Sequence, residues 1–257
     1  MKKIILLLSA FALMLNACSS DDSPSQTPIN QNGVLIKKMI YTSQDEPQDS
    51  PYNITVNFTY NGNKLVQGID DDNYKSVFTY TGDLITKIES FDNNTLDSQD
   101  LFTYNSSGKL TEYRYLSFFD GYEHKYTYTY NLNGTVTVAE FQGTIGNTTG
   151  DSSYVYTYTN GELSSTDTNI YTYDSKNNPF KNVVGFQNIM SPEFTDDFMI
   201  AFGRNHNIVA TTIGSSTTEG IFSTYTYNSD NYPVTSTTNA NNPNGGFIGT
   251  VNVQYFY

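Results

Sequence analysis

One short phrase recurs along most of this chain: an aromatic residue, threonine and tyrosine, then a polar turn, then an apolar residue. The first copy reads FTYNGNKL, from Phe58 to Leu65. The tyrosine that ends each aromatic part, called here the closing tyrosine, stands at Tyr60, Tyr80, Tyr104, Tyr130, Tyr158, Tyr173 and Tyr227. The first four intervals between them are 20, 24, 26 and 28 residues. A period of this kind indicates a repeat architecture.

Each copy of the phrase has the pattern of a β-hairpin. Side chains alternate between the two faces of a strand, so Phe58 and Tyr60 share one face and Thr59 takes the other. Asn-Gly and other glycine-containing turns supply the positive φ that tight hairpins need. The repeat therefore predicts an all-β fold, an antiparallel meander of repeated hairpins that forms a curved sheet. Sheet packing is the first role expected of the tyrosines, ahead of sugar stacking.

The repeat is interrupted once, over residues 181–202. Within it, Ser191 suits a helix N-cap, Pro192 the first helical position and Glu193 the first turn. We therefore expect a short helical insertion near 190–202 that caps an end or edge of the sheet. The single β-repeat domain is expected to span residues 34–257.

The N-terminus has the pattern of a secretory signal peptide. Lys2 and Lys3 precede an apolar run from Ile4 to Leu15, which is shorter than the roughly 20 residues that a membrane-spanning helix needs. Residues 1–17 are therefore assigned as the signal peptide. The polar stretch 18–33 is assigned as a flexible tether.

The stretch LNAC, which ends at Cys18, resembles the lipobox of bacterial lipoproteins. The resemblance implies that Cys18 is the lipid attachment site (a palmitate-type acyl anchor) and the first residue of the mature protein. An ordinary secretory signal with a chance cysteine is the alternative. Cys18 is the only cysteine, so a lipidated chain keeps no thiol for a disulfide, a nucleophile or a zinc site.

The four residues after the cysteine resemble the acidic export tag of surface lipoproteins in Bacteroidota; they are Ser19, Ser20, Asp21 and Asp22. The resemblance implies a lipid-anchored protein of the outer membrane that faces the cell exterior. A solvated acidic linker is the alternative. Removing residues 1–17 takes away two lysines and leaves 11 basic and 26 acidic side chains, a balance of −15. That charge argues against a nucleic-acid partner, because phosphate binding needs Lys and Arg.

The repeat also resembles the YD repeats of Rhs-type proteins, over roughly Val56 to Val234. The aspartate itself stands only at Asp174. A nearer likeness is to cell-envelope lipoproteins of Bacteroidota with YD-like hairpins. Three stretches carry it: YDSKNNPF (Tyr173–Phe180), NHNI (Asn205–Ile208) and YTYNSDNYP (Tyr225–Pro233). It implies a curved β-sheet domain at the cell envelope and brings no activity with it.

Motifs for catalysis, metals or cofactors are missing from the sequence. His124 and His206 stand in different repeats without a second histidine at metal-ligand spacing. The acidic stretches at 70–73 and 195–197 lack the spacing of an EF-hand and fit solvated turns better. We therefore predict no catalytic residue, no metal and no cofactor.

These patterns predict a non-enzymatic binding or scaffolding module that is tethered to the membrane by lipid. Its partner would be a glycan, a peptide or an envelope protein, and the binding face cannot be located from the sequence. The alternative is a surface polymer (glycan) hydrolase with paired carboxylates. A membrane-spanning barrel is rejected, because the outward residues would be Thr and Asn rather than an apolar band.

Overall fold

The computed structural model describes residues 33–44, 51–189, 191, 204–216, 218–241 and 247–257. The chain divides into two compact units, Met1–Asn30 and Gln31–Tyr257. The first unit lies outside the described residues. The predicted signal peptide, the attachment site at Cys18 and the acidic tag lie outside them too, so these stay predictions. The fold below is that of the second unit.

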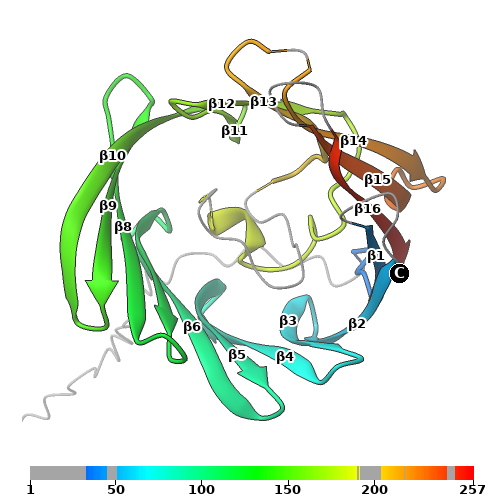
Figure 1. Ribbon diagram of the computed structural model, residues 1–257, viewed down its shortest axis with the longest axis horizontal. Helices are drawn as coiled ribbons and strands as arrows, with labels where there is room; N and C mark the ends of the chain where they lie inside the picture. The colour runs from blue at the N-terminus through cyan, green and yellow to red at the C-terminus, as the bar shows by residue number, and fades with distance from the viewer. Residues whose placement is uncertain (1–32, 45–50, 190, 192–203, 217, 242–246) are drawn as a thin grey trace, which may run out of the picture. The chain divides into compact units, whose positions relative to one another are not determined.

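Antiparallel strands make up most of the described chain, and each pairs with its neighbours in sequence (Figure 1). The last strand also pairs with the first, with Tyr41 opposite Val253, so the sheet closes into a barrel. The sixteen strands are β1 (Lys38–Gln44), β2 (Tyr52–Asn61), β3 (Lys64–Asp70), β4 (Tyr74–Thr81), β5 (Leu84–Asp92), β6 (Thr95–Tyr104), β7 (Leu110–Ser117), β8 (Tyr122–Tyr130), β9 (Val136–Thr144), β10 (Asn147–Thr159), β11 (Glu162–Ser165), β12 (Asn169–Tyr173), β13 (Ile208–Ile213), β14 (Gly220–Tyr227), β15 (Pro233–Asn241) and β16 (Phe247–Phe256).

The antiparallel meander of hairpins is confirmed, whereas the open curved sheet is wrong. The expectation against a barrel is wrong on one point, because the sheet does close on itself. Helix is confined, within the described chain, to one 3-10 turn, η1 (Phe186–Asn188). The helical insertion expected at 190–202 lies outside the described residues except for Ser191, so it is not tested.

A shift of register explains how the hairpins bend into a barrel. It falls directly before the closing tyrosine in six of the seven copies, at Thr59/Tyr60, Thr79/Tyr80, Thr103/Tyr104, Thr157/Tyr158, Thr172/Tyr173 and Thr226/Tyr227. A β-bulge of this kind kinks its strand and increases the local twist. Repeated around a sheet, such bulges produce the curvature that closure requires.

The aromatic side chains of the repeat point into the barrel and the threonines point out. Phe58, Phe78 and Phe102 are buried, while the threonine that follows each of them is exposed. The same alternation holds in every copy, with exposed threonines at Thr59, Thr79, Thr103, Thr129, Thr157, Thr172 and Thr226. The tyrosines therefore pack inside the barrel, and they form no exposed row on which a sugar could stack.

The residue after the closing tyrosine holds the turn in the longer hairpins. The side-chain oxygen of Asn105 accepts hydrogen bonds from the backbone N–H groups of Ser107 (3.0 Å) and Lys109 (3.1 Å). Asn228 makes the same pair of bonds two and four residues on. Short polar side chains that bond their own backbone in this way favour turns. The YD-like position is thus a turn cap.

Residues 174–189, which follow β12, lie within the ring of strands, as Figure 1 shows. We call them the inner segment. Phe180 packs edge-on against Phe58, with ring centroids 5.4 Å apart, and stacks on Phe186 at 5.1 Å. A barrel of sixteen strands is too wide for its own side chains to fill. The inner segment supplies the missing core against β2–β5.

One glycine allows the inner segment to approach the wall of the barrel. Gly185 has a φ of 83°, and a Cβ atom built on it would lie 2.9 Å from the carbonyl oxygen of Asp83. Only glycine combines this backbone conformation with so close an approach. Nearby, the backbone N–H of Val184 donates a 3.0 Å hydrogen bond to the carbonyl of Asn63.

Candidate functional site

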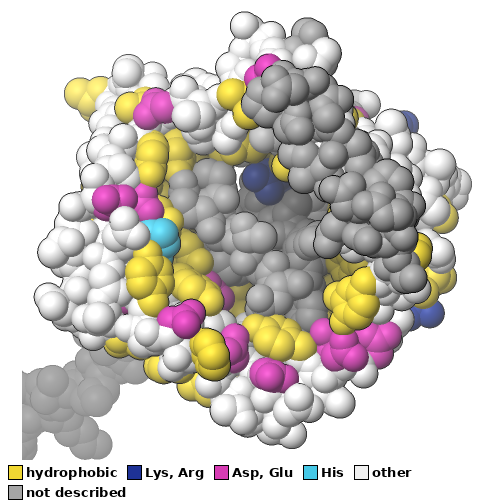
Figure 2. Space-filling model, in the orientation of Figure 1, with side chains coloured by type: hydrophobic (Ala, Val, Ile, Leu, Met, Phe, Trp, Pro, Cys, Tyr) yellow, Lys and Arg dark blue, Asp and Glu magenta, His cyan; other side chains and the backbone are white. Residues whose placement is uncertain are grey.

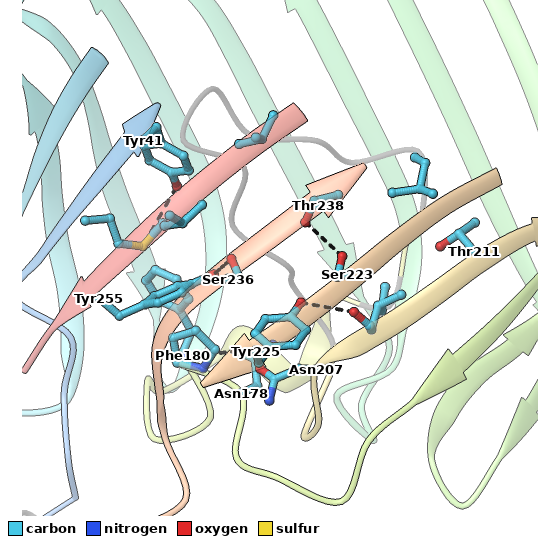
Figure 3. A pocket seen from close by; sticks show the side chains of 16 residues that line it. Tyr41, Asn178, Phe180, Asn207, Thr211, Ser223, Tyr225, Ser236, Thr238 and Tyr255 are labelled. Atoms are coloured by element: carbon cyan, nitrogen blue, oxygen red, sulfur yellow. Dashed lines mark hydrogen bonds between the residues drawn. The ribbon is translucent and has the colours of Figure 1, made fainter. Parts of the chain in front are cut away.

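A cavity of about 300 Å³ lies inside the barrel, between the inner segment and the wall formed by β13–β16 and β1 (Figure 3). Its apolar lining includes Met39, Phe180, Ile221, Val251 and Val253. Strand pairing accounts for this wall, because Val253 lies opposite both Tyr41 and Ser236 and shares their inward face. The cavity is therefore a product of barrel closure, since β1 meets β16 within its lining.

Hydroxyl groups form a row across the cavity wall. Ser223 on β14 lies opposite Thr238 on β15, and their hydroxyl oxygens are 2.8 Å apart. One layer deeper, Ser236 lies 3.0 Å from the hydroxyl of Tyr255 on β16. Figure 3 shows these groups pointing into the same space as Thr211. Each hydroxyl can donate once and accept twice, so pairing leaves hydrogen-bonding capacity for a ligand.

The floor of the cavity is made by the inner segment and the residues just before β13. Asn178 and Asn207 are both buried there. The side-chain oxygen of Asn178 accepts a 2.9 Å hydrogen bond from the backbone N–H of Phe180. The amide of Asn207 donates to the Asp174 carboxylate at 3.1 Å. These amides are thus engaged in holding the floor in place.

A second group of polar side chains lies on the inner face of β8–β10, across the ring from the cavity (Figure 1). Its centre is Glu140, which lies 2.5 Å from the ring nitrogen Nε2 of His124. Glu140 also accepts hydrogen bonds from the hydroxyls of Ser152 (2.5 Å), Tyr126 (3.3 Å) and Tyr154. We call these five residues the glutamate cluster.

The environment of Glu140 keeps its carboxyl group ionised. Burial acts to raise its pKa, but the hydrogen bonds from Ser152 and Tyr154 and the charge of His124 outweigh burial. The net result is a pKa below the ordinary value for glutamate. A general acid in glycoside hydrolysis needs the opposite shift, a carboxyl group that stays protonated.

Another carboxylate of the inner wall, Asp100, is poorly placed for paired-acid chemistry with Glu140. Asp100, on β6, accepts a 2.8 Å hydrogen bond from the hydroxyl of Tyr113. β6 and β9 are three strand spacings apart, which separates the backbones of Asp100 and Glu140 by about 14 Å along the same wall. Carboxyl pairs in glycosidases face each other at about 5–9.5 Å. The hydrolase prediction gains no support from this geometry.

The two histidines are packed against carboxylates, as expected for structural residues. His124 belongs to the glutamate cluster, and His206 Nδ1 lies 2.8 Å from a carboxylate oxygen of Glu162. The acidic stretch at 70–73 forms the turn between β3 and β4, where Asp70 accepts the backbone N–H of Tyr74 at 2.7 Å. The stretch 195–197 lies outside the described residues. Within the described chain no His, Cys, Asp and Glu residues gather as a metal site would require.

The outer face of the barrel carries charge in the middle of its strands. Arg114 on β7 pairs with Glu123 on β8 at 2.8 Å, and Lys87 pairs with Glu89 on β5 at 2.8 Å. Lys125 lies over the outward ring of Phe141, 4.4 Å from its centroid. Lys or Arg facing lipid at mid-membrane costs about 2–4 kcal/mol each. The described outer face therefore carries charged side chains that would be costly to place against lipid.

The rim of the barrel mouth shows acidic and hydrophobic side chains side by side in Figure 2. Two phenylalanines extend from the turn between β7 and β8, Phe118 and Phe119, and the second is 88% exposed. Phe118 is partly covered by its neighbours, whereas Phe119 is open to solvent within the described chain. Among the described residues, no helix has the length and apolar character needed to cross a membrane.

Comparisons with known proteins find likeness among solved structures. No family model matches the chain, and no curated protein matches it. A solved structure of a porin-like protein from Bacteroides uniformis is similar at 16% sequence identity and a TM-score of 0.44. The match covers 86% of this chain and 96% of that chain. At this level the likeness bears on neither the activity nor the location of this protein.

The cavity was missed by sequence reasoning, which left the binding face unknown. Its hydroxyl row falls in the stretches IFSTYTY and PVTSTTNAN, where Ser223, Ser236 and Thr238 break the pattern of large inward residues. Small polar residues at inward positions of a β-repeat are a usable signal. This signal indicates a cavity only when the sheet is known to close into a barrel.

Proposed function

We propose that this protein is a lipid-anchored protein of the bacterial outer membrane whose barrel binds a small ligand and does not convert it chemically. The observation that carries the binding role is the interior cavity of about 300 Å³. That volume lies at the lower end of the range of small-molecule sites, about 300–1,000 Å³. The lining combines an apolar majority with a few convergent polar groups, as such sites do.

The attachment rests on the sequence around Cys18 and on where the described chain begins. Val34 lies beside the inner segment, since its carbonyl accepts a 2.9 Å hydrogen bond from Asn182. A tether that joins the barrel at Val34 therefore reaches it at the end that contains the inner segment. A ligand would then enter at the opposite end, where the turns after β3, β5 and β7 lie.

Ligand binding is tested with a substitution that fills the cavity. Ser223→Tyr places a large side chain in the cavity, whereas Thr224→Tyr places the same side chain on the exposed outer face of β14. The purified barrel is incubated with a small-molecule extract of cell envelopes and examined by native mass spectrometry. We expect a bound mass on the wild type and on Thr224→Tyr that Ser223→Tyr lacks. A bound mass on all three proteins, or on none, contradicts the proposal.

The anchor is tested separately. Cys18→Ala should abolish acyl labelling and release the protein from membranes, because several buried acyl chains are what hold it there. Ser25→Ala, in the tether, should leave both unchanged. Protease treatment of intact cells then separates a surface location from a periplasmic one. Acyl labelling of Cys18→Ala, or its retention on membranes, contradicts a lipid anchor at this residue.

A further inference from the structure

The cavity lining also indicates a class of ligand, an inference that rests on the proposed function. No charged side chain is present among the described residues that line the cavity. Glu140 and Asp100 belong to a different wall and have hydrogen-bond partners of their own. Asp174 does not line the cavity, and its carboxylate accepts hydrogen bonds from the amide of Asn207 and the hydroxyl of Tyr227. An ion placed in the cavity would lose its hydration and meet no charged side chain in the lining, which is strongly unfavourable. The lining therefore selects against anions and cations alike.

The polar capacity of the cavity is concentrated on one patch of its wall. The hydroxyls of Ser223 and Thr238 share one hydrogen bond, and Ser223 also bonds the side chain of Tyr225. Acceptor sites are left on both hydroxyls, and a donor becomes available where a ligand displaces one of these bonds. By contrast, the buried amides of Asn178 and Asn207 already bond the backbone and side chains of the floor. A ligand therefore meets available hydrogen-bonding groups on β14–β15 and few at the floor.

Part of the apolar lining lies deeper than this patch. Met39 and Tyr255 are paired neighbours on β1 and β16, and Phe180 of the inner segment lies beneath them (Figure 3). Met39 is 2% exposed and Phe180 is 2% exposed, so both surfaces are held by packing. Thioether and aromatic groups at this depth favour an alkyl or aromatic body.

We propose that the cavity binds an uncharged amphipathic molecule. Its apolar body lies against Met39, Phe180 and Tyr255. Its single polar group, a hydroxyl, carbonyl or amide, exchanges hydrogen bonds with Ser223 and Thr238. The barrel thus carries a neutral lipid-like or aromatic compound in a water-filled envelope.

The test compares ligands that differ only in charge. N-phenylnaphthylamine, an uncharged fluorescent probe, reports occupancy of the wild type, with Thr224→Tyr as the binding control and Ser223→Tyr as the blocked control. Decanol, decanoate and decylammonium then compete with the probe at neutral pH, below their micelle-forming concentrations. We expect decanol to displace the probe, and both ions to bind at least about tenfold more weakly because of the unpaired charge.

The polar contact is tested with a substitution that keeps the shape of the side chain. Thr238→Val should weaken decanol about fivefold, the effect of losing one neutral hydrogen bond, and should leave the probe unchanged. Thr237→Val, on the outer face beside it, should change neither.

The outcomes separate this inference from the proposed function. If either ion matches decanol on the wild type and Ser223→Tyr still blocks it, the ligand class is wrong and the binding role stands. If no probe or competitor binds and envelope extracts leave no bound mass, the binding role itself is contradicted.

Discussion

The hydroxyl of Tyr104 donates a 2.8 Å hydrogen bond to the backbone carbonyl of Ile85, the first inward residue of the returning strand in the preceding hairpin. Other closing tyrosines repeat this contact: Tyr130 with Leu110 at 2.9 Å, and Tyr173 with Leu163 at 2.8 Å. The final residue, Tyr257, bonds the carbonyl of Pro233 at 3.0 Å in the same manner. At these positions the tyrosine hydroxyl therefore joins successive hairpins.

Removing one of these hydroxyls should weaken the barrel. Tyr104→Phe keeps the ring and leaves the Ile85 carbonyl without this donor, so we expect a loss of about 1–3 kcal/mol in the free energy of unfolding. The control is Thr103→Val on the exposed face of the same strand, which should stay within about 0.5 kcal/mol. Urea unfolding measures both. Equal values for the two variants would mean that the hydroxyl does not link the hairpins.

A pair of glycines tests how closely the inner segment is seated. Gly185 and Gly161 share a φ of 83°, but a Cβ at Gly161 meets nothing within 4 Å. Gly161→Ala should cost about 1–2 kcal/mol, the penalty for the left-handed conformation. Gly185→Ala should cost about 1–3 kcal/mol more, because the new methyl group contacts the Asp83 carbonyl. Comparable losses in urea unfolding would show that the inner segment does not pack against this turn.

Alkaline pH should destabilise the barrel through its tyrosines. Burial raises the pKa of Tyr130 and of Tyr225 to about 12, from an ordinary value of 10.0. The folded state therefore holds these protons more tightly than the unfolded state. The stabilisation is fully present below pH 10 and is lost as the pH rises toward 12. Urea unfolding across this range, with tyrosinate absorbance, checks it; tyrosines that ionise near pH 10 in a folded barrel would contradict it.

At acidic pH, the glutamate cluster makes the stability of the fold depend on pH in the opposite direction. The lowered pKa of Glu140 stabilises the fold above the ordinary value of 4.5, and this stabilisation is lost as the pH falls through the folded value. Glu140→Gln should cost about 1–3 kcal/mol at neutral pH, and the difference from wild type should shrink in acid. The control is Asp230→Asn, an exposed carboxylate in the turn between β14 and β15, expected to change stability by less than about 0.5 kcal/mol. A difference for Glu140→Gln that does not vary with pH would contradict this role.

The hairpins could be predicted from the sequence because their signals are local. Alternation placed Phe58 and Tyr60 on one face, and the Asn and Gly residues marked the turns. Closure could not be predicted, because it depends on bulges such as the one at Thr103/Tyr104 and on pairing between the two ends of the domain. A meander has the same local pattern whether it stays open or meets its own first strand.

The candidate site could not be predicted from the sequence for the same reason. Its lining comes from β1, the last four strands and the inner segment, so no continuous stretch of sequence contains it. The residues that drew attention in the sequence, His124 and His206, proved to be packed against carboxylates. The outward placement of threonine, by contrast, followed directly from the strand period and is confirmed.

Closure of β1 onto β16 is the relation on which the cavity, and with it the proposed function, depends. Thr42 on β1 lies opposite Asn252 on β16, and Thr237 lies opposite Asn252 on its other side. In a Cys18→Ala background, which has no other thiol, cysteines at 42 and 252 should form a disulfide within one chain, since opposed strand residues are within bridging distance. Cysteines at 42 and 237, two strands apart, should not.

The measurement is the intact mass and the non-reducing mobility of both double variants after mild oxidation. The account predicts a monomeric, cross-linked chain for the Thr42→Cys, Asn252→Cys pair and free thiols for the Thr42→Cys, Thr237→Cys pair. Free thiols in the first pair, or cross-links between chains instead of within one, would show that the sheet does not close on itself.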